Sequence, residues 1–355
     1  MESTSGNLKT QWQALKNEQP HLRIRNAAEA LGVSEVELLA TRCGEDVVRL
    51  RPEFANILEG IEQLGKVMAL TRNNDVVHER KGVYLNPSLS NPHVGLFVGA
   101  DIDLRIFFKS WASVYAVTDI VRDKPRHSIQ FFAKDGEAVH KIYMTPHSDM
   151  TAYESLITKF RQEDQNPGQE VFAWDEEVIE HPDESINTQA FQKGWVELED
   201  THDFFGLLKK YKVTRTQALR LAPEGNYAVK VDPIAFRKVV TLAAERDTPI
   251  MVFVGNKGMI QIHTGPVKRL LDHQEWFNIM DPDFNLHVKE PSLKDVWVVR
   301  KPTKDGMVTA LECFDAEGKQ VVQLFGKRKP GIPELEAWRE IIAEVEQQTV
   351  LVTPV

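Results

Sequence analysis

Hydrophobic positions along the chain recur at two different spacings. Three segments have apolar residues three or four positions apart, which is typical of amphipathic helices. These segments are residues 24–40, 214–222 and 236–247. Residues 131–143 and 251–265 have the shorter periodicity of strands, and each segment is interrupted by a turn signal, Asp135-Gly136 in the first and Gly255 to Gly258 in the second. Helices then strands, without β–α alternation, predict an α+β fold with largely antiparallel sheets.

The chain contains two copies of one plan. Trp12 aligns with Trp195 at an offset of 183 residues. Three longer segments align at offsets of 183, 182 and 182, namely 67–82 with 250–265, 102–117 with 284–299, and 131–143 with 313–325. A shared offset within one residue indicates a tandem duplication. We therefore predict two similar halves, each a large, mainly antiparallel β-sheet with packed helices. The N-terminal repeat covers 1–162, an acidic linker 163–189, and the C-terminal repeat 190–355.

The composition excludes several classes of protein. The chain has 355 residues, 42% hydrophobic and 27% charged, as expected for a globular protein with two domains. No stretch approaches the ~18 apolar residues of a membrane span, and the first thirty residues hold no apolar signal core. Residues 163–189 contain nine acidic side chains and no Lys or Arg, which equals the whole net charge of −9. A general affinity for nucleic acid or anionic membranes is therefore not expected. Two distant cysteines fit the reducing cytoplasm.

The candidate chemistry lies in residues 201–215, "THDFFGLLKKYKVTR". Phosphate-loop, dinucleotide, nucleophile-elbow and zinc-protease signatures are missing from the sequence. The segment instead combines one histidine, His202, with aromatic, aliphatic and cationic side chains. Haem requires such a combination: an axial imidazole, apolar contacts and cations for its propionates. A histidine near a helix N-terminus also favours the neutral, ligating form. The alternative is an ordinary amphipathic helix in which the Phe and Leu side chains are core.

The two halves differ at three further candidate positions. At these offsets His202 lies opposite Gln19, Arg105 opposite His287, and His78 opposite Gln261. A special residue kept in only one copy suggests a single site. Drift at exposed positions is the alternative.

Residues 23–40 resemble a DNA-binding helix-turn-helix, with a turn at Gly32 and an N-cap at Ser34. The second helix carries Glu35 and Glu37 where a recognition helix usually has Arg, Asn or Gln. We therefore interpret the segment as a helical hairpin that packs on a sheet.

Several segments resemble the bacterial cytoplasmic haem-trafficking and hemin-degrading proteins of the HemS/ChuS type, most closely the pseudomonad haem-shuttle members. They are "MALTRNNDVVHERKG", "DIDLRIFF", "DTHDFFGLLKK", "TRTQALRLA", "IMVFVGNKGMIQIHTGPV", "FNLHV", "VRKPTKDG" and "VVQLFGKRKPG". The resemblance covers nearly the whole chain and includes the duplication. It implies a cytoplasmic haem-binding protein of iron acquisition, with haem against the second half and the first half contributing to the opposite face.

The resemblance also implies roles for particular residues. His202 corresponds to the proximal iron ligand and Arg105 to a distal-side arginine. The other expected haem contacts are Arg215, Phe253, Lys209, Lys301, Arg328 and His78. Asp203 and Phe205 stand where the pseudomonad shuttle has further histidines, and Phe325 replaces a tyrosine of some relatives. The first two departures put ligand exchange among neighbouring histidines in doubt, and Phe325 removes a possible hydrogen bond to a propionate or bound water.

The expected function is to receive imported haem and carry it to degradation or use. The alternative is an enzyme that opens the porphyrin ring oxidatively and releases iron, with Arg105 as the catalytic candidate. A haem-responsive regulator is a third and less favoured class. Expected partners are haem, a downstream haem oxygenase or other acceptor, and a haem importer, without membrane insertion.

Overall fold

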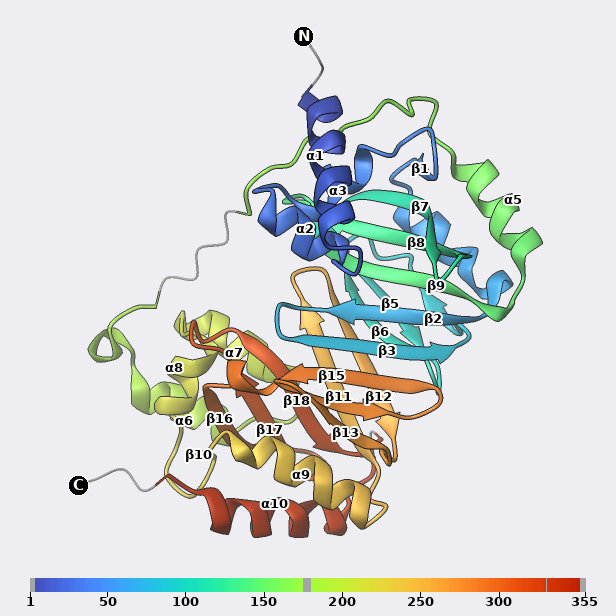
Figure 1. The fold of residues 1–355 in the computed structure, drawn as a ribbon. Coiled ribbons are helices and arrows are strands. Elements are labelled where there is room, and N and C mark those ends of the chain that lie inside the picture. Colours follow the sequence, from blue (N-terminus) through green and yellow to red (C-terminus); the bar gives the residue numbers. More distant parts are fainter. Residues whose placement is uncertain (1–3, 175–179, 330, 352–355) are drawn as a thin grey trace. The chain divides into compact units, whose positions relative to one another are not determined.

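The computed structural model describes residues 4–174, 180–329 and 331–351 (Figure 1). The helices of these residues are α1 (Thr4–Glu18), α2 (Ile24–Ala30), α3 (Glu35–Ala40), α4 (Phe54–Glu59), α5 (Met150–Phe160), α6 (Thr188–Val196), α7 (Asp203–Tyr211), α8 (Arg215–Arg220), α9 (Ile234–Glu245) and α10 (Glu336–Thr349). None of the helices formed by the described residues is long and apolar enough to cross a membrane.

The first half contributes strands β1 to β9 and the second half β10 to β18. They are β1 (Val47–Leu50), β2 (Gly65–Arg72), β3 (Val76–Gly82), β4 (Pro87–Ser88), β5 (Val94–Val98), β6 (Asp103–Phe107), β7 (Trp111–Val121), β8 (Lys124–Ala133) and β9 (Ala138–Ser148). Those of the second half are β10 (Ala228–Val231), β11 (Ile250–Asn256), β12 (Met259–Gly265), β13 (Leu270–His273), β14 (Trp276–Met280), β15 (Phe284–Lys289), β16 (Asp295–Thr303), β17 (Gly306–Phe314) and β18 (Gln320–Gly326).

Within the described ranges the strands form two nine-stranded sheets with the same plan. One has the order β1-β7-β8-β9-β2-β3-β15-β14-β13, and the other β10-β16-β17-β18-β11-β12-β6-β5-β4. Each order lists six strands of one half and then three of the other, and the two lists correspond strand for strand. The α+β class, the antiparallel pairing and the duplicated plan are thus confirmed. The expectation of a separate sheet for each half needs one change, because each sheet contains six strands of one half and three strands of the other.

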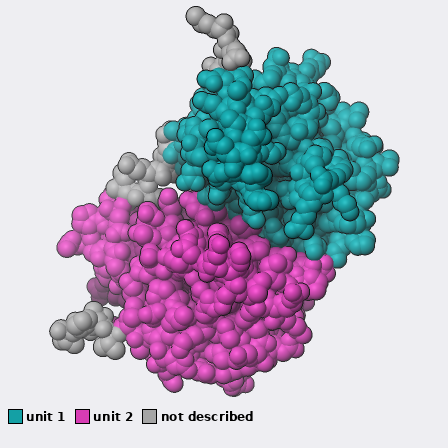
Figure 2. All heavy atoms as spheres, in the orientation of Figure 1, with its two compact units in different colours: residues 1–72, 78–175, 255–261 teal, residues 73–77, 176–254, 262–355 magenta. Residues whose placement is uncertain are grey.

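The chain divides into two compact units (Figure 2). Unit 1 comprises residues 1–72, 78–175 and 255–261, and unit 2 comprises residues 73–77, 176–254 and 262–355. Strands β3 and β12 therefore have residues in both units.

Hydrogen bonds hold both ends of the acidic segment 163–189, of which residues 175–179 lie outside the described residues. On unit 1 the hydroxyl of Tyr115 donates to Gln169, at 2.5 Å. On unit 2 the hydroxyl of Thr214 donates to Glu180, at 2.8 Å. The described ends of the segment are therefore attached to the unit on their own side.

In unit 2, one face of the sheet β10-β16-β17-β18-β11 packs against α9 and α10. Val298, Leu311 and Leu324 from the strands share a buried cluster with side chains of both helices. Helix α10 approaches β18 closely, because a Cβ added at Gly326 would lie 2.5 Å from Cγ of Trp338. This face is closed by its helices, so a ligand site on this part of the sheet must use the other face.

The helix-turn-helix-like segment of unit 1 packs on the sheet. Val36 and Leu39 of α3 are buried in one cluster with Tyr115 and Phe132 of β7 and β8. Ser34 caps α3 in a reciprocal capping box. The exposure of Glu35, at position N1, is only 6%. The start of α3 is therefore turned towards the sheet.

Candidate functional site

The second face of the unit 2 sheet carries half-buried aromatic residues and buried charged residues. In the antiparallel register Phe253 pairs with Gln323, and Gln323 pairs with Glu312. Directly paired residues point to the same face, so these side chains share one side of the sheet. The same register places Phe325 and Lys301 on this side. The rings of Phe253 and Phe325 meet with centroids 5.0 Å apart and remain half-buried.

A buried ion cluster lies on this face. The guanidinium of Arg215 donates to both carboxylate oxygens of Glu312, each at 2.7 Å, and Nζ of Lys301 donates to Oε1 at 2.7 Å. Glu312 is fully buried and Lys301 is 4% exposed, whereas the Arg215 side chain keeps 26% of its surface. Both cations also lie over the ring of Phe204. Cζ of Arg215 is 5.5 Å from the ring centroid, and Nζ of Lys301 is 4.5 Å from it. The predicted basic residues Arg215 and Lys301 are therefore brought together, but by a carboxylate that the sequence analysis missed.

The charged groups of this cluster shift one another's pKa values. Burial by itself would raise the pKa of Glu312, but the charges and hydrogen bonds of Arg215 and Lys301 outweigh it and lower the pKa to about 2. Burial lowers the pKa of Lys301 to about 8, and the raising effect of Glu312 only partly compensates. At neutral pH Glu312 is ionised and Lys301 remains mainly protonated, so the three groups carry a net charge of about +1.

His202 occupies the N-cap of α7, and 89% of its side-chain surface is exposed. Oδ1 of Asp200 accepts hydrogen bonds from the backbone N–H of His202, at 2.8 Å, and from its Nδ1, at 2.6 Å. The pKa of Asp200 is lowered, first because it accepts the backbone N–H of His202. Because an ionised carboxylate can only accept, Nδ1 carries a proton, and in the neutral ring Nε2 is the nitrogen with the free lone pair. The imidazole is thus held in the tautomer of a metal ligand, with its carboxylate partner in place.

Helix α7 is anchored through its inner side. Phe204, Leu207 and Leu208 are buried in a cluster with α6 and α8. The ring of Trp195 in α6 contacts that of Phe204 at a centroid distance of 4.5 Å. These residues are core, as the alternative interpretation of the segment held. Phe205 differs, because it is 62% exposed.

One further predicted cation lies on this helix and another lies near its start. Nζ of Lys209 is 4.6 Å from the ring centroid of Phe205. Arg328 follows β18, and its charge contributes to lowering the pKa of Asp200, after the hydrogen bonds from His202. Six predicted contacts therefore belong to unit 2, on the second face of its sheet or beside α7: His202, Arg215, Phe253, Lys209, Lys301 and Arg328.

The two remaining predicted residues belong to unit 1. Arg105 lies on β6, half-buried, where it donates to Asp103 and to the carbonyl of Leu104. His78 lies inside β3 and has no exposed surface. The ring of His78 is therefore part of the interior.

The equivalent place in the first half has its charges reversed. Ser34 and Thr214 cap α3 and α8 in the same way, and Gly32 and Lys212 both have the left-handed backbone two residues earlier. These landmarks set the local offset at 180, not 183. Glu35 then lies opposite Arg215. Glu35 is buried and pairs with Lys141 and Arg72.

At this local offset of 180 His202 lies opposite Leu22, whereas at the offset of 183 it lies opposite Gln19. Neither offset places a histidine in the first half. Together with the reversed ion pair, this leaves the histidine and its cation cluster on unit 2.

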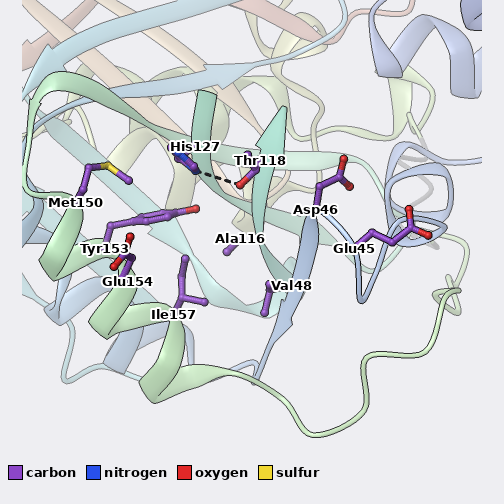
Figure 3. A pocket seen from close by; sticks show the side chains of 10 residues that line it. All are labelled: Glu45, Asp46, Val48, Ala116, Thr118, His127, Met150, Tyr153, Glu154 and Ile157. Carbon is purple, nitrogen blue, oxygen red and sulfur yellow. Dashed lines mark hydrogen bonds between the residues drawn. The ribbon is translucent and has the colours of Figure 1, made fainter. Parts of the chain in front are cut away.

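A pocket of unit 1 is lined by ten residues and contains none of the predicted site residues (Figure 3). Nδ1 of His127 lies 3.1 Å from the hydroxyl of Thr118, and the ring of Tyr153, from α5, lies below these two side chains in the view. His127 and Tyr153 have tilted rings with centroids 5.7 Å apart. The pocket is therefore a separate feature from the histidine and cation cluster of unit 2.

Comparison with known proteins identifies the family. The model described as "Haemin-degrading HemS.ChuX domain" matches twice, over residues 32–160 and 212–345. The hemin transport protein HemS of Yersinia enterocolitica is 38% identical over 96% of this chain and 97% of its own length.

Two solved structures share the complete fold. Holo-PhuS, a heme-binding protein from Pseudomonas aeruginosa, is 45% identical with a TM-score of 0.93 and covers 96% of this chain and 98% of its own. The heme degrading enzyme ChuS of Escherichia coli O157:H7 is 36% identical with a TM-score of 0.89, covering 96% and 99%. The twofold domain match, the sequence identity and the shared architecture show that the chain belongs to the HemS/ChuX haemin-degrading family.

Proposed function

We propose that this protein binds haem through His202 and carries it in the cytoplasm to a site of degradation or use. The observation that carries the proposal is an exposed imidazole whose Nδ1 is committed to Asp200, so that Nε2 is presented as a ligand. The names of its relatives support haem as the cargo, since they describe a heme-binding protein and a hemin transport protein.

The residues of unit 2 fit the other requirements of haem. Phe253 and Phe325 provide an apolar aromatic surface. Arg215, Lys301 and Glu312 together carry the net positive charge suited to one propionate. Because Glu312 takes Nε and Nη2 of Arg215, Nη1 is the group of this guanidinium that we assign to the propionate. Lys209 and Arg328 offer further positive charge beside α7.

We assign Arg105 of unit 1 to the opposite face of haem, on the basis of the family resemblance. The half-exposed guanidinium is already paired with Asp103, which holds it on β6. His78 contributes no surface, so a role in haem binding would require β3 to rearrange.

Carriage and degradation use the same pocket and are not separated by its residues. When bound, haem supplies the redox chemistry of its iron, given an electron donor and oxygen or peroxide. The protein's residues hold the cargo, and a single histidine ligand suits handover because an acceptor has one axial bond to displace. We propose a downstream haem-degrading enzyme or other acceptor as one partner, and a haem importer as the donor.

Replacing His202 by Ala tests the ligand directly. We expect the ferric Soret band to shift and hemin affinity to fall by about tenfold or more, since loss of an outer-shell partner already costs a metal site about that much. Absorbance titration of the purified chain with hemin measures both. The matched control is His273→Ala, which removes another exposed histidine of unit 2 and should change neither. Unchanged spectra and affinity in the His202 variant would remove this residue from the ligand role.

A turnover assay separates carrier from enzyme. With hemin in excess over protein, a physiological reductant and catalase, we expect no more than stoichiometric loss of haem, because a carrier alone provides no catalytic cycle. Absorbance and iron release are followed together. Several turnovers per chain to a biliverdin-like product, with catalase present, would instead establish the degrading enzyme.

Glu312→Gln tests the charge cluster. It leaves Arg215 and Lys301 together without a countercharge, so the free energy of unfolding should fall by about 3–5 kcal/mol at pH 7. The folded-state pKa of Glu312 is about 2, below its ordinary 4.5. The contribution of its carboxylate is therefore complete above pH 4.5 and is lost as the pH falls from 4.5 towards 2. In the Gln variant the free energy of unfolding should lack this decrease between pH 4.5 and 2.

Urea unfolding at a series of pH values measures these changes. Glu317→Gln, at the exposed turn between β17 and β18, is the control and should stay within about 0.5 kcal/mol of the wild type. Equal effects of the two substitutions would contradict the role of Glu312.

A further inference from the structure

Helices α6 and α7 each contain one interior glycine, and only one of the two has a packing reason. A Cβ added at Gly194 in α6 would lie 2.5 Å from Cδ1 of Leu207, so this glycine allows α6 and α7 to approach. A Cβ added at Gly206 in α7 would have no described atom within 4 Å. Gly206 also has no left-handed backbone that would require glycine. Glycine weakens a helix interior more than any residue except proline, so packing and conformation leave Gly206 unexplained.

Gly206 lies on the outward face of α7, one turn after His202. Residues three, four and seven positions after His202 share its side of the helix, and they are Phe205, Gly206 and Lys209. All four are exposed, whereas the opposite side of the helix is buried. The outward face therefore presents an imidazole, an exposed aromatic ring, a bare stretch of backbone and a cation.

The direction of side chains on a helix makes the bare position significant. Each Cα–Cβ bond tilts towards the helix N-terminus, so a side chain at residue 206 would extend towards the turn that carries His202. A flat ligand whose metal is bound by Nε2 extends sideways across the end of the imidazole and needs that space. Phe205 and Lys209 lie on the same face but do not fill the space beside His202, because the ammonium of Lys209 lies over the ring of Phe205.

We propose that Gly206 is a positioning residue that keeps α7 clear beside His202, so that a planar tetrapyrrole can lie against the helix while Nε2 reaches its metal. The proposal rests on the proposed haem-binding function. The proposal explains the cost of Gly206 to helix stability by the room that it leaves for the ligand. Replacing Gly206 should therefore stabilise the protein and weaken hemin binding.

The experiment compares Gly206→Ala and Gly206→Leu with the wild type, each as the full chain. Without hemin, Gly206→Ala should raise the Tm by about 2 °C, because alanine is the better helix former and its methyl group meets nothing. Hemin affinity, measured by absorbance titration, should fall several-fold with Ala and by about fiftyfold or more with Leu, because a clash at a packed ligand costs a few kcal/mol.

Two controls separate clearance from damage to the helix. Lys210→Leu adds the same side chain at an exposed position of α7 that is one turn farther from His202, and it should leave hemin affinity within about twofold. Modification of the apo-protein by diethyl pyrocarbonate, with His202 followed by peptide mass, should proceed at the wild-type rate in Gly206→Ala. An unchanged rate shows that the imidazole is still accessible and that the tetrapyrrole, not the histidine, has been excluded.

The outcomes distinguish the two proposals. If the wild type itself fails to bind hemin, the proposed function is wrong. If the wild type binds hemin and loses it on His202→Ala, but Gly206→Leu binds as tightly as the wild type, the clearance role is overturned. Equal loss of affinity in Lys210→Leu and Gly206→Leu would also overturn it, because the effect would not depend on position.

Discussion

The proposed ligand role of His202 depends on one hydrogen bond, from its Nδ1 to the carboxylate of Asp200. Without it an exposed imidazole would exchange between two tautomers and rotate, and either nitrogen could face solvent. With it, one nitrogen carries the proton and the other is presented to a ligand. The same carboxylate oxygen accepts the backbone N–H of His202, so Asp200 fixes both the main chain and the ring at the start of α7. The buried inner side of that helix then attaches the histidine to the sheet of unit 2.

Glu312 gives the neighbouring cations their arrangement. Two positive side chains that share a buried face repel each other, and a fully buried carboxylate between them allows both to stay charged. The first half solves the same packing problem with opposite signs, since Glu35 comes from the helix and Lys141 from the strand. A duplicated scaffold therefore keeps a buried ion pair in each copy, and the copy with Arg on the helix is the one that carries His202.

The sequence predicted what depends on local patterns and on the duplication. The α+β class and both hairpin turns, at Gly136 and before Gly258, follow from periodicity and turn chemistry and agree with the strand bounds. The exchange of three strands between the sheets was not predictable, because non-local pairing leaves no mark in a single strand's pattern. His202 and Arg215 were named from the segment 201–215 and from the family resemblance, and Lys301 from the resemblance alone. Asp200 and Glu312 were missed, since a carboxylate two residues from a histidine or inside a strand looks like an ordinary polar residue until the fold pairs it.

The most direct measurement is the protonation pattern of His202 in the apo-protein, observed by long-range proton–nitrogen NMR on ¹⁵N-labelled chain. The expected result is that the neutral ring carries its proton on Nδ1, with Nε2 the nitrogen whose resonance is lost or shifted when hemin is added. A ring protonated on Nε2, or a hemin titration that leaves both nitrogens of His202 unchanged, would contradict it.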